Sequence, residues 1–311
     1  MYYVSPWAVQ LDARRGRQHE RGSDVFKKIL LALDGSELSE GIIPFVEGLA
    51  KAGRAQVTVL YVSNSEENAT VAKARFKGVT PNAYLNGVAG NLKDAGIAAD
   101  TAELSGKPAD EIVNLAKKKK YDLIAMSTHG RSGVGRLVYG STTDKVIHAT
   151  GLPMLLNKPQ AKKSAQGALR VAVVPLDGSE LGESVLPTVE EFASRLAMSV
   201  ALIRVVSTAT MAFAGVDPQA YDPRINEYMM ESATEYLKEK AEALRARGVK
   251  VTTKAVRGDA ANNVIDYAAD MAGSMVVMST HGRSGLGRFV LGSVADRILR
   301  ASPRPVLLLR P

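Results

Sequence analysis

The chain contains no cysteine among its 311 residues. This absence excludes disulfide bonds, thiolate metal sites and cysteine nucleophiles together. No apolar run is long enough to span a bilayer, so no association with a membrane is predicted. From these absences we expect a soluble, cytoplasmic protein.

Positive charge is in moderate excess, with a formal net charge of +8. Part of it lies in four consecutive lysines at 117–120 and part in the arginines of the first 24 residues. A lysine run before a buried strand is typical of a solvated helix end. We therefore do not expect nucleic acid as a partner.

One segment of the chain is repeated. Residues 127–141 read STHGRSGVGRLVYGS and residues 279–293 read STHGRSGLGRFVLGS, so twelve of fifteen positions are identical at an offset of 152. A second match, around Asp34 and Asp177, has an offset of 143. The second copy therefore carries nine extra residues, and we expect them in the polar stretch 207–223 because loops absorb insertions readily.

The repeat divides the chain into two domains, residues 25–158 and 169–311. Residues 159–168 are polar, contain proline and glycine, and are predicted to be a linker. Residues 1–24 have no counterpart in the second copy and are expected to form a disordered leader. The leader has no continuous apolar core and is not a secretory signal; an arginine-rich organellar presequence is the alternative.

Each copy alternates short apolar runs with helical periodicity. The expected strands are residues 29–33, 57–62, 98–103, 123–127 and 153–157, and then 171–176, 200–206, 250–256, 275–279 and 305–309. The clearest helices are expected at 227–247, 142–149 and 294–301. Runs that are apolar on both faces and separated by helices predict two tandem doubly wound, Rossmann-like α/β domains. Each is a five-stranded parallel sheet with helices on both faces.

The repeated loop has the residues of a phosphate cradle. Glycine allows positive φ angles and lets backbone N–H groups approach an anion. Ser141 and Ser293 stand where a helix begins, so the hydroxyl and the free N–H groups of that terminus can donate to a phosphate. The loop contains four glycines in each copy: Gly130, Gly133, Gly135 and Gly140, and Gly282, Gly285, Gly287 and Gly292.

Two familiar phosphate motifs are absent from this loop. The spacing from Gly130 to Gly135 matches a P-loop, but Arg136 and Leu137 follow instead of lysine and serine or threonine. A dinucleotide-binding pattern fails because Val138 stands where it needs glycine. The loop also follows the fourth strand, whereas a P-loop normally follows the first.

Other candidate residues also stand at strand ends. Asp34 and Asp177 follow the first strand of each copy, and Val62 and Val205 close the second. In a doubly wound sheet, ligands bind beyond the carboxyl ends of the strands where the strand order reverses. We therefore expect the aspartates, the valines and the glycine loops to converge on one crevice in each domain.

Both halves resemble a tandem universal stress protein of the ATP-binding branch, with an adenine nucleotide alpha hydrolase-like fold. That branch has the pattern Gly-x-x-Gly, nine residues, then Gly-Ser or Gly-Thr. Here the pattern runs from Ser127 to Gly130 and ends at Gly140-Ser141, and the second copy repeats it. Each copy has serine in place of the first glycine, which is expected to place a Cβ beside the ribose-phosphate path.

By position, the resemblance implies that the aspartates contact the adenine end of ATP and that the valines line its pocket. The loop and the helix after it would hold ribose and phosphates, and Mg²⁺ or Mn²⁺ would accompany the nucleotide. The predicted binding residues are Asp34, Val62, Met126, Ser127, Gly130, Gly140, Ser141 and Thr142, and Asp177, Val205, Met278, Ser279, Gly282, Gly292, Ser293 and Val294. The resemblance also implies pairing of residues 153–157 with 305–309, and a homodimer of tandem chains.

Each of these residues has a plainer interpretation. Asp34 and Asp177 can cap the first helix, and Met126 and Met278 can be core residues. His129 and His281 lie in the repeated loops, but no Ser/His/Asp set or metal-ligand set accompanies them. For these histidines we expect a hydrogen bond that orders the loop.

The sequence therefore predicts an ATP-binding stress-response protein that acts as a nucleotide-dependent switch or partner-binding module. No general base stands out, so any ATP hydrolysis is expected to be slow. One alternative is a nucleotide-free interaction protein of the same fold. Another is an adenylate-forming or ATP-pyrophosphatase enzyme, which would need a Ser-Gly-Gly-rich first loop that Asp34-Gly-Ser-Glu does not provide.

Overall fold

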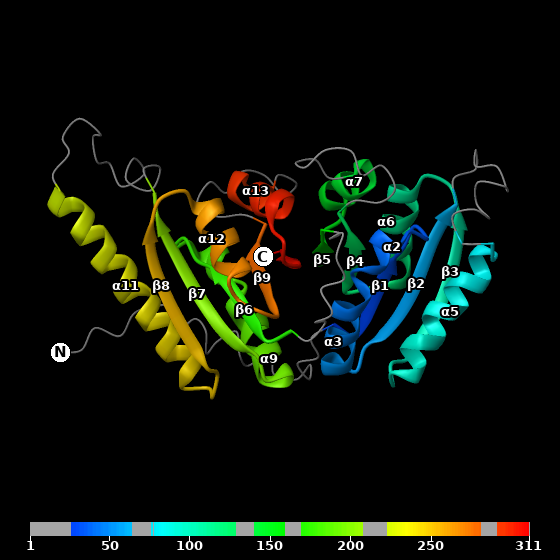
Figure 1. The fold of residues 1–311 in the computed structure, drawn as a ribbon, viewed down its shortest axis with the longest axis horizontal. Coiled ribbons are helices and arrows are strands. Elements are labelled where there is room, and N and C mark those ends of the chain that lie inside the picture. The colour runs from blue at the N-terminus through cyan, green and yellow to red at the C-terminus, as the bar shows by residue number, and fades with distance from the viewer. Residues whose placement is uncertain are drawn as a thin grey trace.

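The computed structural model describes residues 26–63, 76, 78–128, 140–158, 169–207, 223–280 and 291–310. Strands and helices alternate there in two successive modules, residues 26–158 and 169–310 (Figure 1). The strands are β1 (Lys28–Ala32), β2 (Gln56–Ser63), β3 (Ala99–Ser105), β4 (Leu123–Ser127) and β5 (Met154–Asn157), then β6 (Val171–Pro175), β7 (Ser199–Val206), β8 (Val251–Arg257), β9 (Ser274–Ser279) and β10 (Val306–Leu309).

The helices follow the same order in both modules. Those of the first are α2 (Glu37–Glu40), α3 (Ile43–Gly53), α5 (Pro81–Asp94), α6 (Pro108–Lys119) and α7 (Ser141–Ala149). Those of the second are α8 (Glu180–Glu183), α9 (Leu186–Leu196), α11 (Pro223–Arg245), α12 (Ala260–Ala269) and α13 (Ser293–Ala301).

Each module contains a five-stranded parallel sheet, in the order β3-β2-β1-β4-β5 and its counterpart β8-β7-β6-β9-β10. The strand order reverses at β1 and at β6. In the first module β2 and β3 lie on one side of β1 and β4 and β5 on the other, and the second module repeats this arrangement around β6. This arrangement confirms the predicted doubly wound fold and places the switch point between β1 and β4 and between β6 and β9.

The two sheets join into one ten-stranded sheet through their last strands. β5 and β10 pair antiparallel, with Leu155 opposite Leu307 at the centre of the register. This is the only antiparallel pair among the described strands. The expected pairing of the last strands is therefore confirmed, and the tandem chain is an internal pseudo-dimer.

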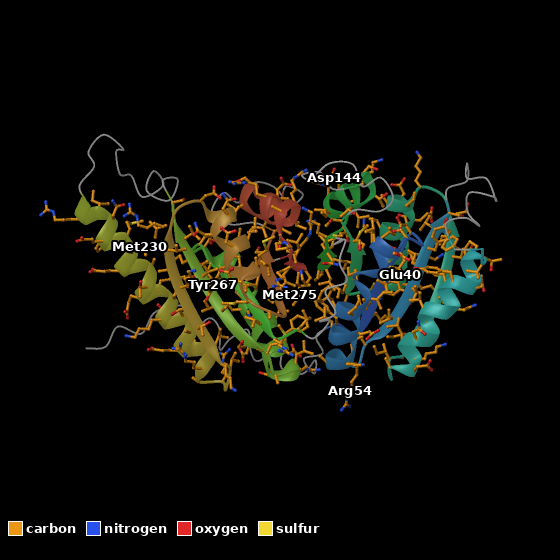
Figure 2. The ribbon with its side chains drawn as sticks, viewed as in Figure 1. Glu40, Arg54, Asp144, Met230, Tyr267 and Met275 are labelled. Atoms are coloured by element: carbon orange, nitrogen blue, oxygen red, sulfur yellow. The ribbon has the colours of Figure 1, made fainter. Side chains whose placement is uncertain are left out.

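Helices cover both faces of this sheet, as the alternation of the strands requires. Side chains of α3, α5, α9 and α11 pack into one hydrophobic core, and those of α6, α7, α12 and α13 into the other. Both cores contain residues from both modules. Met275 of β9, drawn in Figure 2, is fully buried in the first of them.

Contacts across the module boundary are direct on the face that carries α3 and α9. These two helices contact each other in the middle of the molecule (Figure 1). The ring of Phe26, which precedes β1, lies 5.4 Å from the ring of Phe192 on α9, centroid to centroid. Both side chains are buried, so apolar packing holds the modules together in addition to the strand pairing.

The expected position of the nine extra residues is wrong. α11 has 23 residues and α5 has 14, while the segments that precede them, 207–222 and 64–80, are similar in length. The insertion therefore lengthens a helix, and α11 reaches well past the neighbouring end of β8 in Figure 1. Helix elongation adds a backbone hydrogen bond with each residue and leaves the packing below unchanged, so a helix end also accommodates an insertion.

None of the helices in the described ranges has both the length and the apolar character needed to cross a membrane.

Candidate functional site

The predicted site residues that the structure describes lie at one edge of each sheet. Asp34 lies two residues after the end of β1, Val62 lies near the end of β2, and Met126 near the end of β4. β1 pairs with both β2 and β4, so the three positions are neighbours at the carboxyl edge. Val62 and Met126 pack into the same hydrophobic core. Asp177, Val205 and Met278 occupy the corresponding places in the second module.

Several predicted residues lie outside the described part of the chain. Gly130 and Gly282 belong to the segments 129–139 and 281–290, for which we describe no structure. The same segments contain His129, His281 and the arginines of the repeated loop. Their roles stay predictions from the sequence.

The aspartate after the first strand holds the serine that caps the next helix. The backbone N–H and the hydroxyl of Ser36 donate to Oδ1 of Asp34 over 3.0 and 2.6 Å. Ser36 Oγ in turn accepts a hydrogen bond from the N–H of Ser39 in α2. The interpretation of Asp34 as the helix cap is therefore wrong, because the cap is Ser36. Oδ2 of Asp34 accepts no hydrogen bond from the described residues.

The second module repeats this turn with the same distances. Ser179 donates to Asp177 Oδ1 from its N–H over 3.0 Å and from its hydroxyl over 2.6 Å, and it caps α8. Gly35 and Gly178, between aspartate and serine, have φ angles of +79° and +86°, which glycine adopts readily and other residues rarely do. These two glycines are required by the backbone of the turn.

Gly140 and Gly292 differ from these two glycines, because neither their backbone angles nor the described residues around them require glycine. Their φ and ψ angles are −60° and 144°, and −61° and 147°, which any residue adopts. A Cβ built on Gly140 would lie 3.6 Å from the carbonyl oxygen of Thr128, and one on Gly292 would lie 3.5 Å from that of Thr280, both ordinary contacts.

The same two glycines close the base of the repeated loop. The N–H of Gly140 donates to the carbonyl oxygen of Thr128 over 2.8 Å, and that of Gly292 to Thr280 over 3.0 Å. Thr128 and Thr280 are themselves tied to the last strand, through their N–H groups and the carbonyl oxygens of Asn157 and Leu309. The ends of each glycine loop are therefore held together at the carboxyl edge of β4 or β9.

The helices that begin at these glycines have exposed, uncapped N-termini. Gly140 and Gly292 are the N-cap residues of α7 and α13 and make no side-chain capping bond. The other helices with a described N-cap have either a capping side chain or a proline in the first turn. The first N–H groups of α7 and α13, together with the exposed Ser141 and Ser293, are thus available to an anion.

The serine that replaces the family's first glycine is turned toward α2. Ser127 Oγ donates to the carbonyl oxygens of Ser39 and Leu38 over 3.1 and 3.3 Å. Met126, its neighbour in β4, packs into the opposite core. The side chain of Ser127 is therefore directed away from the face that carries Met126. Its expected position beside the ribose-phosphate path stays a prediction. The backbone of Ser127 remains a predicted contact, and so does that of Ser279.

A tyrosine lies close to each aspartate–serine turn, Tyr84 on α5 in the first module and Tyr236 on α11 in the second. Burial raises the pKa of the Tyr84 phenol well above its ordinary range, and the nearby carboxylates of Glu40 and Asp34 raise it further. Burial also raises the pKa of Tyr236, together with a 2.8 Å hydrogen bond from its hydroxyl to Glu183. Both phenols therefore stay neutral, and neither supplies a base to the site.

Sequence reasoning missed Asn157, and it recognised Thr143 only as a residue near the site that differs from its counterpart Ala295. The hydroxyl of Thr143 in α7 donates to the carbonyl oxygen of Ser127 over 3.1 Å, and Asn157 Nδ2 donates to Gly41 over 3.0 Å. Both side chains are buried behind the candidate site. The available signal was a comparison of the two copies, in which Thr143 corresponds to Ala295 and Asn157 to Leu309, a polar residue against an apolar one.

Comparison with known proteins assigns the family. The profile of the universal stress protein family matches residues 26–158 and 169–310, so the chain belongs to the universal stress protein family and is a tandem of two such domains. Universal stress protein MJ0531 of Methanocaldococcus jannaschii is 32% identical over 150 residues, which cover 46% of this chain and 88% of that protein. Universal stress protein Slr1230 of Synechocystis sp. is 22% identical over 314 residues, 91% of this chain and 100% of that protein.

A solved structure with the same tandem architecture supports the fold. The crystal structure of a universal stress protein from Archaeoglobus fulgidus matches with a TM-score of 0.68 and 21% sequence identity. The match covers 91% of this chain and 98% of that one.

Proposed function

We propose that this protein binds one adenine nucleotide, namely ATP, at the carboxyl edge of each module. The observation that carries the proposal is the pair Gly140 and Gly292. Each is glycine although neither its φ angle nor the described residues around it require glycine. Each also begins a helix that has no side-chain cap. A phosphate group seated on these N-termini accounts for both facts.

The predicted contacts divide along the nucleotide. Asp34 and Asp177 would accept hydrogen bonds at the adenine end, against an apolar wall of Val62 and Met126 or Val205 and Met278. Gly140, Ser141 and Thr142 would hold ribose and phosphates in the first site. Gly292, Ser293 and Val294 would do so in the second, where Val294 is 41% exposed.

Mg²⁺ or Mn²⁺ would arrive with the phosphates. In the described residues no group of three or more histidine, aspartate or glutamate side chains is placed to hold a metal ion. Both ions coordinate phosphate oxygens and water with few protein ligands, so the donor set here fits a metal bound through the nucleotide. The metal would neutralise phosphate charge.

We propose a switch or partner-binding role in stress response, in the cytoplasm, with slow hydrolysis at most. His148, on α7, bonds the carbonyl oxygen of Asp144 one turn earlier in the same helix rather than facing the N-terminus. The phenols of Tyr84 and Tyr236, held neutral by burial, likewise supply no general base. Hydrolysis would then act as a timer for the bound state.

Equilibrium dialysis of the nucleotide-stripped protein with ATP tests the proposal, and two nucleotides per chain are expected. The double substitution Gly140→Val and Gly292→Val should abolish binding, because the added side chains occupy the phosphate positions. The denaturation midpoint should stay unchanged, because the backbone accepts valine. Stoichiometry near zero in the unsubstituted protein would favour a nucleotide-free interaction protein of the same fold.

We also propose that the tandem chain forms a homodimer. β5 and β10 are already paired within the chain, so a dimer of chains would use another surface. Light scattering coupled to size exclusion gives the mass directly, and 33.2 kDa is the value for one chain.

A further inference from the structure

We propose that the two nucleotide sites of one chain are unequal, and that Thr143 and Asn157 make the first the tighter. The inference rests on the proposed function and concerns what differs between the modules. The main-chain frame of the two sites is the same: the aspartate–serine turn, the closed loop base and the uncapped helix occur in both. The side chains that brace this frame are not the same.

In the first module, Thr143 links the phosphate-binding helix to β4. Its hydroxyl donates to the carbonyl oxygen of Ser127 over 3.1 Å, and its side chain is buried. Ser127 ends β4 immediately before the glycine loop. The counterpart of Thr143 is Ala295, which has no hydroxyl. The second module therefore lacks this link between its last helix and the strand that begins the loop.

A second brace joins the last strand to the turn region. Asn157 at the end of β5 donates from Nδ2 to the carbonyl oxygen of Gly41, the C-cap of α2, over 3.0 Å. The carbonyl oxygen of Asn157 also accepts from the N–H of Thr128, but this main-chain bond recurs between Leu309 and Thr280, so only the Nδ2 bond distinguishes the first module. The counterpart of Asn157 is Leu309, which packs into the hydrophobic core and cannot donate. In the first module, Asn157 therefore hydrogen-bonds both the base of the loop, at Thr128, and the end of α2, at Gly41.

The surroundings of the aspartate also differ. In the first module the ring of Phe76 lies against Gly35 and contacts the rings of Tyr61 and Tyr84, so an aromatic ring and not a charged group lies against this glycine. In the second, the guanidinium of Arg204, the counterpart of Tyr61, lies against Gly178.

This guanidinium is held firmly in place. Arg204 stacks on the ring of Tyr236 at 4.2 Å, and Tyr236 bonds Glu183, which pairs with Lys240 over 2.9 Å. Gly178 directly follows Asp177, so a fixed positive charge stands beside the carboxylate that would recognise adenine. Part of the carboxylate's strength as an acceptor is thereby offset.

Both differences act in the same direction. Hydrogen bonds that hold the helix, the loop base and the turn in one arrangement before binding reduce the ordering that the ligand must impose. An uncompensated Asp34 is the better acceptor. We expect ATP to bind the first site about tenfold or more tightly than the second, which corresponds to about 1.4 kcal/mol.

Isothermal titration calorimetry of the full chain, with single-site variants, tests the inference. Gly292→Val leaves only the first site and should retain the tight component. Gly140→Val leaves only the second and should retain the weak one. If the two variants bind ATP within threefold of each other, or if Gly140→Val binds more tightly, the inequality is wrong although nucleotide binding stands. If the unsubstituted chain takes up no ATP, the proposed function itself is wrong, and the inequality with it.

The role of Thr143 is tested in the Gly292→Val background. Thr143→Val has the same shape without the hydroxyl and should weaken binding three- to tenfold, whereas Thr143→Ser retains the hydroxyl and should restore affinity. Thr234→Ala, on the exposed face of α11, is the matched control and should have no effect. In the Gly140→Val background, Ala295→Thr should strengthen the second site.

A merely structural role for Thr143 gives a different pattern. It would lower the denaturation midpoint of Thr143→Val and leave the ATP affinity of the folded protein unchanged. That result would remove Thr143 as a positioning residue.

Discussion

Lys158 Nζ donates to the carbonyl oxygen of Arg300 over 3.1 Å, and Arg310 makes the counterpart bond to the carbonyl oxygen of Ile147. Each cation directly follows the last strand of its own module and reaches the last turn of the other module's last helix. Positive charge is favourable at a helix C-terminus, so this reciprocal contact stabilises the boundary between the modules.

Removal of Arg310 should therefore weaken the tandem. We expect Arg310→Ala to lower the free energy of unfolding by about 1–2 kcal/mol, since a partly buried carbonyl loses a charged donor. Urea denaturation measures the change. Lys117→Ala, at an exposed lysine of α6, serves as the control and should stay within about 0.5 kcal/mol of the unsubstituted protein. Equal effects of the two substitutions would contradict a role for Arg310 at the boundary.

The shared cores predict that the two modules unfold together. Phe192→Ala removes a buried ring that contacts Phe26 of the other module and should cost about 3–5 kcal/mol. Because both cores draw on both modules, the variant should still unfold in one transition at a lower temperature. Calorimetry and far-ultraviolet circular dichroism report the transition. Two separated transitions would show that the modules are energetically independent.

Two glycines of the first module should respond in opposite ways to the same substitution. Gly35→Ala forces a side chain into a positive φ and against the Phe76 ring, so we expect a loss of about 1–3 kcal/mol in stability. Gly140→Ala has no such conflict and should change stability by less than about 0.5 kcal/mol. Its effect should appear in ATP affinity. A large loss of stability in Gly140→Ala would mean that the chain itself requires that glycine.

Asp259 gives the fold a specific dependence on pH. The N–H of Asn262 and the guanidinium of Arg297 lower the pKa of its carboxyl, and the carboxylate both caps α12 and ties it to α13. A lowered pKa in the folded state means that this stabilisation is present above the ordinary pKa of aspartate and is lost as pH falls through the folded value.

The expected cost of Asp259→Ala is about 1 kcal/mol at neutral pH, as for a lost helix cap. The difference between the variant and the unsubstituted protein should shrink in denaturation series taken down to acid pH. Asp266→Ala, at an exposed position of the same helix, should show no such convergence. A difference that is constant with pH would exclude the charged form of Asp259 as its source.

Most of the architecture followed from the repeat and from the apolar runs. β4 coincides with its predicted span of 123–127, and the other predicted strands overlap the observed ones within two residues at each end. Strand pairing within each module was predictable because helical crossovers between buried strands leave little choice but a parallel sheet. The pairing of β5 with β10 was expected only through the family resemblance.

What the sequence did not reveal depends on side-chain direction and on space. The turn of Ser127 toward α2 follows from the alternation of β4, but the strand's register had to be known first. Both Asp34 and Ser36 have a side-chain oxygen that could cap α2, and the sequence does not tell which one accepts the hydrogen bond from the helix; in the structure it is Ser36. The extra residues lengthened α11 at an end that reaches beyond the sheet, which is a property of the fold and not of the inserted residues.

The tandem arrangement, closed by the antiparallel pairing of β5 with β10, has a consequence for how the two proposed sites can change. In an assembly of two identical chains, one altered codon alters both sites at once. Here each site has its own codons, so the first can have Thr143 and Tyr61 where the second has Ala295 and Arg204. Because one chain carries both modules, their pairing through β5 and β10 does not weaken when the protein is diluted. A fused pair can therefore specialise one half while the other retains its original task.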